Sequence, residues 1–240
     1  TLPAGTYAAG KVQVQQTDVA GNVSANAQLP ATTVDTAVVA PTVALAQDTG
    51  SSATDGITSN GTVNVPGLES GGTWNYSTDG GTTWQNGSGT SFTLPAGTYA
   101  AGKVQVQQTD VAGNVSANAQ LPAVTIDTTK PLVDINPIAG PGPITGTSDL
   151  IGGTVTVKFP DNTTATATGG ADGKWTVPNP GGLTTGGNVD ATVTDPAGNV
   201  GTTTEAVGNL SVATPSVALA QDTGTSATDG ITKDGTVNVT

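Results

Sequence analysis

Residues 93–123 read TLPAGTYAAGKVQVQQTDVAGNVSANAQLPA, and this stretch decides the fold. Apolar and polar residues alternate from Lys103 to Gln107, as they do in a strand with one buried face. Turn-forming clusters, LPAGTYAAG and DVAGN, bound this strand on both sides. The same residues occur without a change at 1–31, so the chain is built from repeats.

A second repeated stretch fixes the period of the array. PTVALAQDTGSSATDGITSNGTVNV begins at Pro41 and returns from Pro215 as PSVALAQDTGTSATDGITKDGTVNV. A period of about 90 residues is too long for a solenoid and suits a self-contained sandwich domain. The alignment predicts the back half of one module at 1–40, a complete module at 41–128, a divergent complete module at 129–213, and the opening of a third copy at 214–240.

Short runs of alternating apolar and polar residues fill both complete modules, and clusters of Gly, Pro, Asp and Asn separate these runs. No segment longer than one turn has the pattern of a helix. About seven short strands per module predict an all-β chain of tandem immunoglobulin-like β-sandwiches. We expect Trp74, Trp84 and Trp175 to be core residues, since single aromatics in strands usually are. The predicted strands include 62–65, 73–77, 91–94, 103–107, 154–159, 174–177 and 189–193.

The composition excludes most familiar catalytic chemistry. His, Cys, Met and Arg are absent, so the chain has no Ser-His-Asp triad, Cys nucleophile, His or Cys zinc site, or disulfide. Six Lys against 18 acidic residues give a net charge of −12, which argues against nucleic acid as a partner. No apolar run approaches the length of a membrane span, so we expect no membrane insertion in this part of the chain.

Two motifs have the spacing of known functional motifs. Gly97–Lys103 has the spacing of a phosphate loop, but Val104 stands where a magnesium-binding Ser or Thr belongs, and a strand follows. Ser77–Trp84 matches the Asp-box hairpin, S-x-D-x-G-x-T-W, in which Asp79 sets the turn. We interpret both motifs as turns.

The aspartates recur at fixed positions in the modules and are the candidate functional residues. They are the majority of the acidic residues, and Asp suits turns and hard-cation sites better than it suits helices. Their positions are the module start (Asp35, Asp127), an Asp-x-Ile in the first loop (Asp55, Asp149, Asp229), an Asp-x-Ala-Gly-Asn near the module end (Asp18, Asp110, Asp195), and an Asp-Thr-Gly (Asp48, Asp222).

Sandwich topology predicts where these aspartates meet. The A–B loop, residues 48–58, joins the first two predicted strands of its module and faces the following module. The F–G loop, which joins the last two strands of that following module, lies at the end nearer to the A–B loop. We therefore expect Asp48, Asp55, Asp127 and Asp195 to converge at one junction, and Asp35 with Asp110 at the preceding one. Carboxylates, carbonyls and water there would supply the six to eight oxygens that calcium takes. The alternative is that each Asp only caps its own turn.

The quoted segments resemble the tandem bacterial immunoglobulin-like repeats of large biofilm-associated (Bap-like) and RTX-type surface adhesins. The resemblance rests on DTGSSATDGITSNGTVNV, YSTDGGTTW, LPAGTYAAG and VQQTDVAGNVS, and it covers 1–128 and 214–240. It implies an extracellular or surface-anchored extender that is exported by type I secretion, stiffened by calcium between modules, and active in adhesion and biofilm formation. It places the calcium ligands on Asp48, Asp55, Asp110, Asp127 and Asp195.

The leading hypothesis is therefore a non-enzymatic stalk module. Its partners would be neighbouring repeats of the same chain, and a host or matrix surface reached through a distal tip. An alternative is a module that binds a carbohydrate or protein ligand, although aromatic residues are sparse. An enzyme that uses paired Asp residues is the weakest hypothesis, because acids repeated in every module do not form one unique site.

Overall fold

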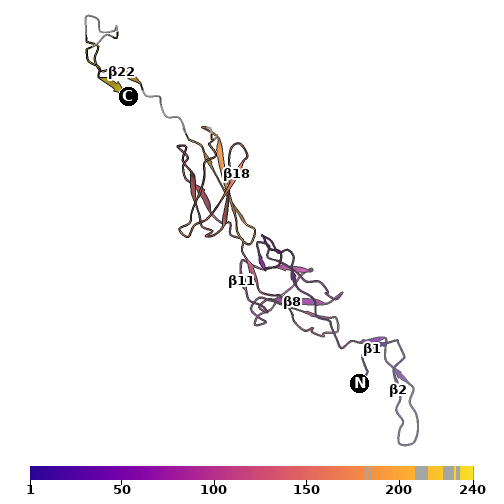
Figure 1. The fold of residues 1–240 in the computed structure, drawn as a ribbon. Helices are drawn as coiled ribbons and strands as arrows, with labels where there is room; N and C mark the ends of the chain where they lie inside the picture. Colours follow the sequence, from indigo (N-terminus) through magenta and orange to yellow (C-terminus); the bar gives the residue numbers. More distant parts are fainter. Residues whose placement is uncertain (182, 184, 209–215, 224–229, 231–232, 240) are drawn as a thin grey trace. The chain divides into compact units, whose positions relative to one another are not determined.

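The computed structural model describes residues 1–181, 183, 185–208, 216–223, 230 and 233–239, and all its regular elements are strands (Figure 1). The chain divides into two compact units, which we describe separately. The first unit is Thr1–Leu132 with Val193–Gly201, and the second is Val133–Thr192 with Thr202–Thr240. The described residues include no helix that is long and apolar enough to cross a membrane.

The first unit holds fourteen strands and the turn between β20 (Asn188–Thr194) and β21 (Val200–Ala206). The strands are β1 (Gly5–Tyr7), β2 (Gln13–Val14), β3 (Ala27–Gln28), β4 (Thr32–Val34), β5 (Ala44–Leu45), β6 (Ile57–Thr58), β7 (Thr62–Asn64), β8 (Thr73–Ser77), β9 (Gln85–Asn86), β10 (Ser91–Thr93), β11 (Gly97–Tyr99), β12 (Gln105–Thr109), β13 (Ala119–Gln120) and β14 (Val124–Ile126).

Strands β5 to β14 of the first unit form an immunoglobulin-like sandwich. One sheet has the order β10-β7-β5 and the other has the order β13-β12-β8-β9, and β11-β14-β6 form a third, small sheet. Alternation along β7 and β12 buries Val63 and Val106 completely. Trp74 of β8 packs in the same core and is 6% exposed, as predicted. The loop that carries Asp48 and Asp55 runs from β5 to β6, and β6 pairs with β14 in the small sheet before the chain reaches β7.

Trp84 differs from the prediction that it is a large core residue. Its ring is only half-buried, and its Nε1 donates to the carbonyl oxygen of Gly81 at 3.1 Å. It therefore lies against the hairpin turn that begins at Ser77. Asp79 holds that turn by accepting hydrogen bonds from Thr83 N at 3.0 Å and Thr83 Oγ1 at 2.7 Å. The Thr83 side chain, together with its backbone N–H, holds the pKa of Asp79 far below its usual range.

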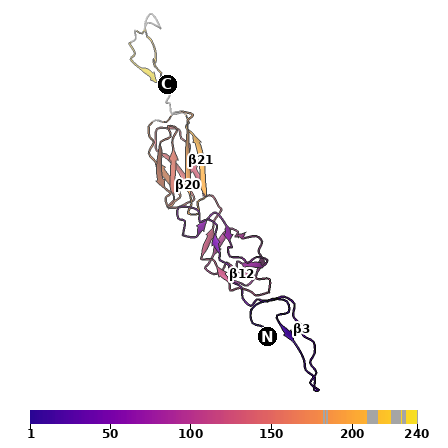
Figure 2. The same ribbon diagram turned by 90° about the vertical axis from the view of Figure 1, so that its right-hand side faces the viewer.

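The second unit contains a second sandwich. Its sheets have the orders β15-β16-β19 and β18-β17-β20-β21, and Figure 2 shows β20 beside β21. Val155 and Val157 of β17 are fully buried, and Trp175 of β19 is 3% exposed, as predicted. The strands are β15 (Val133–Ile135), β16 (Ile144–Ser148), β17 (Thr154–Lys158), β18 (Thr164–Thr168), β19 (Lys174–Val177), β20 (Asn188–Thr194), β21 (Val200–Ala206), β22 (Val217–Leu219) and β23 (Val237–Val239).

Candidate functional site

The Asp-x-Ala-Gly-Asn loops share one geometry in all three copies. In each, the Asp Oδ1 accepts the N–H of the Asn four residues later at 2.8 Å, for Asp18, Asp110 and Asp195 alike. The Asn side chain also donates to the Asp Oδ2, at 2.9, 2.7 and 2.8 Å respectively. Both carboxylate oxygens therefore have donors inside the loop, which is the turn-capping arrangement.

The loop asparagine lowers the pKa of the carboxylate in two of these loops. Its side-chain hydrogen bond is the largest effect that holds the pKa of Asp18 and of Asp110 below the ordinary value. These aspartates are therefore ionised at neutral pH, and amide donors already surround them. A cation would have to displace an amide group to bind both oxygens of either carboxylate.

The same asparagine joins the loop to the linker aspartate. Asn199 Nδ2 donates to the carbonyl oxygen of Asp127 at 2.8 Å, and Asn114 Nδ2 donates to that of Asp35 at 3.2 Å. The Asp127 linker therefore contacts the Asp195 loop, and the Asp35 linker contacts the Asp110 loop. Each contact joins a side-chain amide to a main-chain oxygen, and the Asp127 carboxylate itself accepts the N–H of Thr129 at 2.9 Å.

The A–B loop holds an acid with an unsatisfied oxygen. Asp48 Oδ2 accepts the N–H of Gly56 at 2.9 Å, while its Oδ1 is buried and has no hydrogen-bond partner among the described residues. Asp222, the equivalent residue in the third copy, repeats this pattern within the same described part of the chain, with Oδ2 accepting Gly230 N at 3.1 Å and Oδ1 buried without a partner there. A buried carboxylate oxygen without a donor costs free energy, so both copies hold a feature that an added ligand would relieve.

Asp48 and Asp55 line one cavity of about 460 Å³ in the first unit. Asp55 Oδ1 accepts the N–H of Ile57 at 2.9 Å. Apolar residues complete the cavity, among them Val43, Leu45 and Leu121. Two carboxylates at one cavity are fewer than the three or four expected from sequence.

Thr49 connects the A–B loop to the 195–199 loop. Its Oγ1 donates to the carbonyl oxygen of Ala197 and accepts the N–H of Ser59 at 2.7 Å. Ser59 N also donates to the carbonyl oxygen of Ala197, at 3.1 Å. The two backbones approach so closely that a Cβ at Gly50 would collide with the carbonyl oxygen of Pro196.

Sequence reasoning missed Thr49, Gly50, Asn114 and Asn199 because it followed the charged residues alone. The signal was available, since Asp-Thr-Gly returns at Asp222 and the loop asparagine accompanies every loop aspartate. Neutral hydroxyl and amide groups make the contacts that were expected from carboxylates. The structure therefore brings together the predicted loops, and the contacts between them are uncharged.

The remaining predicted metal residues lie apart from these contacts. Asp149 is exposed at the end of β16, and Asp229 lies outside the described residues, as does the predicted boundary at 213. Within the described ranges, no three acidic side chains are grouped so that they could hold a metal ion. A calcium site remains a prediction, for which Asp48 and Asp222 fit best because each keeps a buried oxygen available.

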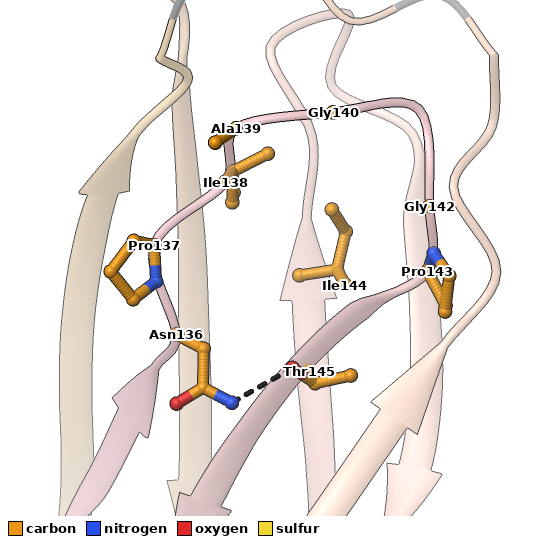
Figure 3. Close-up of a pocket in the computed structure, with 9 residues that line it drawn as sticks. All are labelled: Asn136, Pro137, Ile138, Ala139, Gly140, Gly142, Pro143, Ile144 and Thr145. Atoms are coloured by element: carbon orange, nitrogen blue, oxygen red, sulfur yellow. Dashed lines mark hydrogen bonds between the residues drawn. The ribbon is translucent and has the colours of Figure 1, made fainter.

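A cavity in the second unit lies between β15 and β16 and offers no ionisable group. Figure 3 shows Asn136 Nδ2 donating to Thr145 Oγ1, at 2.8 Å, below an arch of chain that runs through Gly140. Proline, alanine, glycine and isoleucine make up the rest of its lining, and its volume is about 210 Å³. It therefore has no side chain that could act as a general acid or base.

No protein-family model and no curated protein matches the chain. Among solved structures, a tetra-tandem repeat in the extending region of a large adhesion protein is 23% identical, with a TM-score of 0.32; the match covers 88% of this chain and 58% of that one. A biofilm-associated protein BSP domain is 20% identical, with a TM-score of 0.29 and coverages of 65% and 29%.

A third similar structure is SGBP-B of Bacteroides ovatus in complex with a mixed-linkage heptasaccharide. It is 15% identical, with a TM-score of 0.26, and the match covers 86% of this chain and 54% of that one. This chain thus spans little more than half the length of the first of these structures, and less than a third of the second. All three TM-scores are below 0.5, so the functional proposal rests on the chain's own residues.

Proposed function

We propose that the chain is a run of non-enzymatic extender repeats from a bacterial cell-surface adhesin. The observation that carries this proposal is the repeated bond between loop and linker, from Asn114 to Asp35 and from Asn199 to Asp127. A stalk needs the same joint many times, whereas a catalyst needs one distinct site. The sequence resemblance to adhesin repeats and the lack of His, Cys and Arg point the same way.

The joint has a direct test in the loop asparagines. Replacing both Asn114 and Asn199 by Ala removes the donors to the linker while leaving the aspartates in place. Small-angle scattering of the full chain should then show a broader distribution of interatomic distances, because the linkers lose a fixed partner. Asn86→Ala is the matched control, since among the described residues its side chain bonds only to Asn75, across a hairpin.

An unchanged distance distribution in the double variant would remove the support that this joint gives to the stalk proposal. Binding of the wild-type chain to a defined glycan, at a site that a single substitution abolishes, would favour the ligand-binding alternative instead. Neither outcome depends on calcium.

Calcium stiffening is a second part of the proposal. Its support is the buried, unpartnered Oδ1 found in both Asp48 and Asp222. Asp48, Asp55 and nearby carbonyl oxygens would hold the ion at the A–B loop, where it would offset the repulsion between the two carboxylates. In this chain a bound ion would order the loop that contacts Ala197.

Calcium titration followed by melting temperature tests this part. The wild-type chain should melt several degrees higher with calcium, because an ion bound only by the folded state stabilises it. The double variant Asp48→Asn with Asp222→Asn should lose this increase. Asp161→Asn should keep it, because Asp161 only caps Thr163 at 2.9 Å. An equal increase in the double variant would exclude these two residues as ligands.

Surface location, export by type I secretion and a role in biofilm formation complete the proposal. They come from the resemblance to adhesin repeats rather than from any single contact in this chain. Expression of the surrounding protein with and without these repeats, followed by surface labelling and a biofilm assay, tests them. Unchanged adhesion after deletion of the repeats would contradict an extender role.

A further inference from the structure

β18 forms one edge of the four-stranded sheet in the second unit. Its residues are Thr-Ala-Thr-Ala-Thr, a sequence that reads the same in both directions. The three threonines are exposed and the two alanines are half-buried. Within the described part of the chain, β17 is the only strand that pairs with β18, so its other side is an open edge.

The hydrogen-bond pattern shows which backbone groups lie at this open edge. Antiparallel strands alternate between residues that bond to the neighbour and residues that point away from it. Phe159 N donates to Thr163 O, and Gly169 N donates to Gly153 O, each at 2.9 Å, on either side of the pairing of β17 with β18. The odd-numbered residues of β18 therefore bond to β17. The backbone groups of Thr164, Thr166 and Thr168 face outward.

The edge also lacks the usual protection against pairing. Edge strands normally carry a Lys, a Pro or a bulge that blocks a second chain. β18 has none of these, and its register with β17 is regular from Thr164 to Thr168. The opposite edge strand, β21, ends with Glu205 and Ala206 and has no palindrome. The two edges of one sheet thus differ in how well they suit self-association.

We propose that β18 pairs antiparallel with β18 of a second copy of this chain, about a twofold axis at Thr166. In that register Thr164 lies opposite Thr168 of the partner copy, and each alanine lies opposite an alanine. Each threonine then donates one backbone hydrogen bond and accepts one. Cross-strand threonine pairs are favourable, and alanines leave room for close approach.

The palindrome selects a second copy as the occupant. An unrelated strand could use the backbone groups, whereas a twofold axis through Thr166 also places every threonine opposite a threonine and every alanine opposite an alanine. The resulting sheet would run continuously through both molecules. The argument uses only β18 and its neighbours, so it stands independently of the calcium and adhesin proposals.

Single cysteines test the register, because the chain contains no cysteine. A Thr166→Cys chain should form disulfide-linked dimers on mild oxidation, since directly opposed residues lie about 5.5 Å apart, within bridging range. Thr164→Cys alone should not, because its two copies would be about 14 Å apart. A mixture of Thr164→Cys and Thr168→Cys chains should form the mixed dimer. Efficient cross-linking of Thr164→Cys alone, or none in the Thr166→Cys chain, would overturn the proposal.

Sedimentation of the full chain over a concentration series provides the second test. It should be done at high ionic strength, because two chains with a net charge of −12 repel each other. Thr166→Pro removes an outward N–H without breaking a bond to β17, and it should lower the association constant about tenfold or more. Thr166→Lys should act similarly while keeping the backbone N–H. Thr202→Lys, on the opposite edge, is the matched control and should associate like the wild type. A wild-type chain that stays monomeric, or equal association in all variants, would overturn the proposal.

Discussion

Residues 1–31 and 93–123 have the same sequence and differ in what surrounds them. Their turns are alike, since Gln13 Nε2 donates to Gly10 O at 2.8 Å and Gln105 Nε2 donates to Gly102 O at 2.8 Å. Their strands are not alike. β2 has two residues where β12 has five.

The difference shows which features are local and which are tertiary. β12 pairs with β8 along its whole length, and Val106 is fully buried beneath the opposing sheet. The equivalent Val14 is 65% exposed, and β2 pairs only with β3 among the described residues. A turn forms from its own residues, whereas strand length and core burial require a partner strand.

The largest effect is expected from a charge placed in the two equivalent strands. Val106→Asp buries a carboxylate without a partner and should destabilise its module by more than about 4 kcal/mol. Val14→Asp should change stability by less than about 0.5 kcal/mol, because the side chain is already in water. Hydrogen exchange of residues 103–109 and 11–17 measures both. Similar losses in the two variants would mean that the exposed strand is packed in solution.

Removal of the covering aromatic ring should make β12 behave more like β2. Trp74→Ala leaves a cavity against Phe92, whose ring centroid lies 6.0 Å away, and should cost about 3–5 kcal/mol. Exchange at Val106 should then rise toward the rate at Val14. Trp84→Ala, at the half-buried turn position, is the control and should cost less. Equal costs for the two tryptophans would contradict the burial difference.

A buried amide gives a smaller difference between the copies. Gln108 is 1% exposed; its Nε2 donates to Val39 O, and its Oε1 accepts Glu69 N at 2.8 Å. Gln108→Ala removes these hydrogen bonds together with a buried side chain and should cost about 1–3 kcal/mol in urea unfolding. The equivalent Gln16 is exposed, so Gln16→Ala should be close to neutral. A neutral Gln108→Ala would show that water replaces its amide.

The distinction between local and tertiary features explains which predictions from the sequence were correct. Alternation and turn residues were sufficient for the all-β sandwich, for the strands at Thr154 and Lys174, and for the Asp79 turn. They did not place Trp84, because a hydrophobic ring in an alternating run looks the same whether a sheet or a turn covers it. Burial depends on residues far away in sequence, which a local pattern does not contain.

The candidate site divides in the same way. The meeting of the linker with the Asp195 loop followed from topology and is present. The identity of the contacting atoms did not follow, because several side chains could donate to the same carboxylate. In the structure Asn199 donates to both oxygens of Asp195. Thr49 was missed because a hydroxyl carries no charge signal, although its contacts join two loops.

The smallest expected effect is a pKa change that tests whether the Asp-x-Ala-Gly-Asn loop is held by its own residues alone. Asn114→Ala and Asn22→Ala should raise the pKa of Asp110 and Asp18 by the same amount, because each carboxylate loses the same amide donor. The folded pKa is the depressed one, so the loop's contribution to stability is fully present above the ordinary value of 3.8 and declines as the pH falls through the folded pKa. Carbon-13 NMR titration of the carboxyls measures both shifts. Among the described residues, the bond from Asn114 to Asp35 is the one contact of this asparagine that Asn22 lacks. A larger pKa shift at Asp110 than at Asp18 would therefore show that this linker bond also holds the loop.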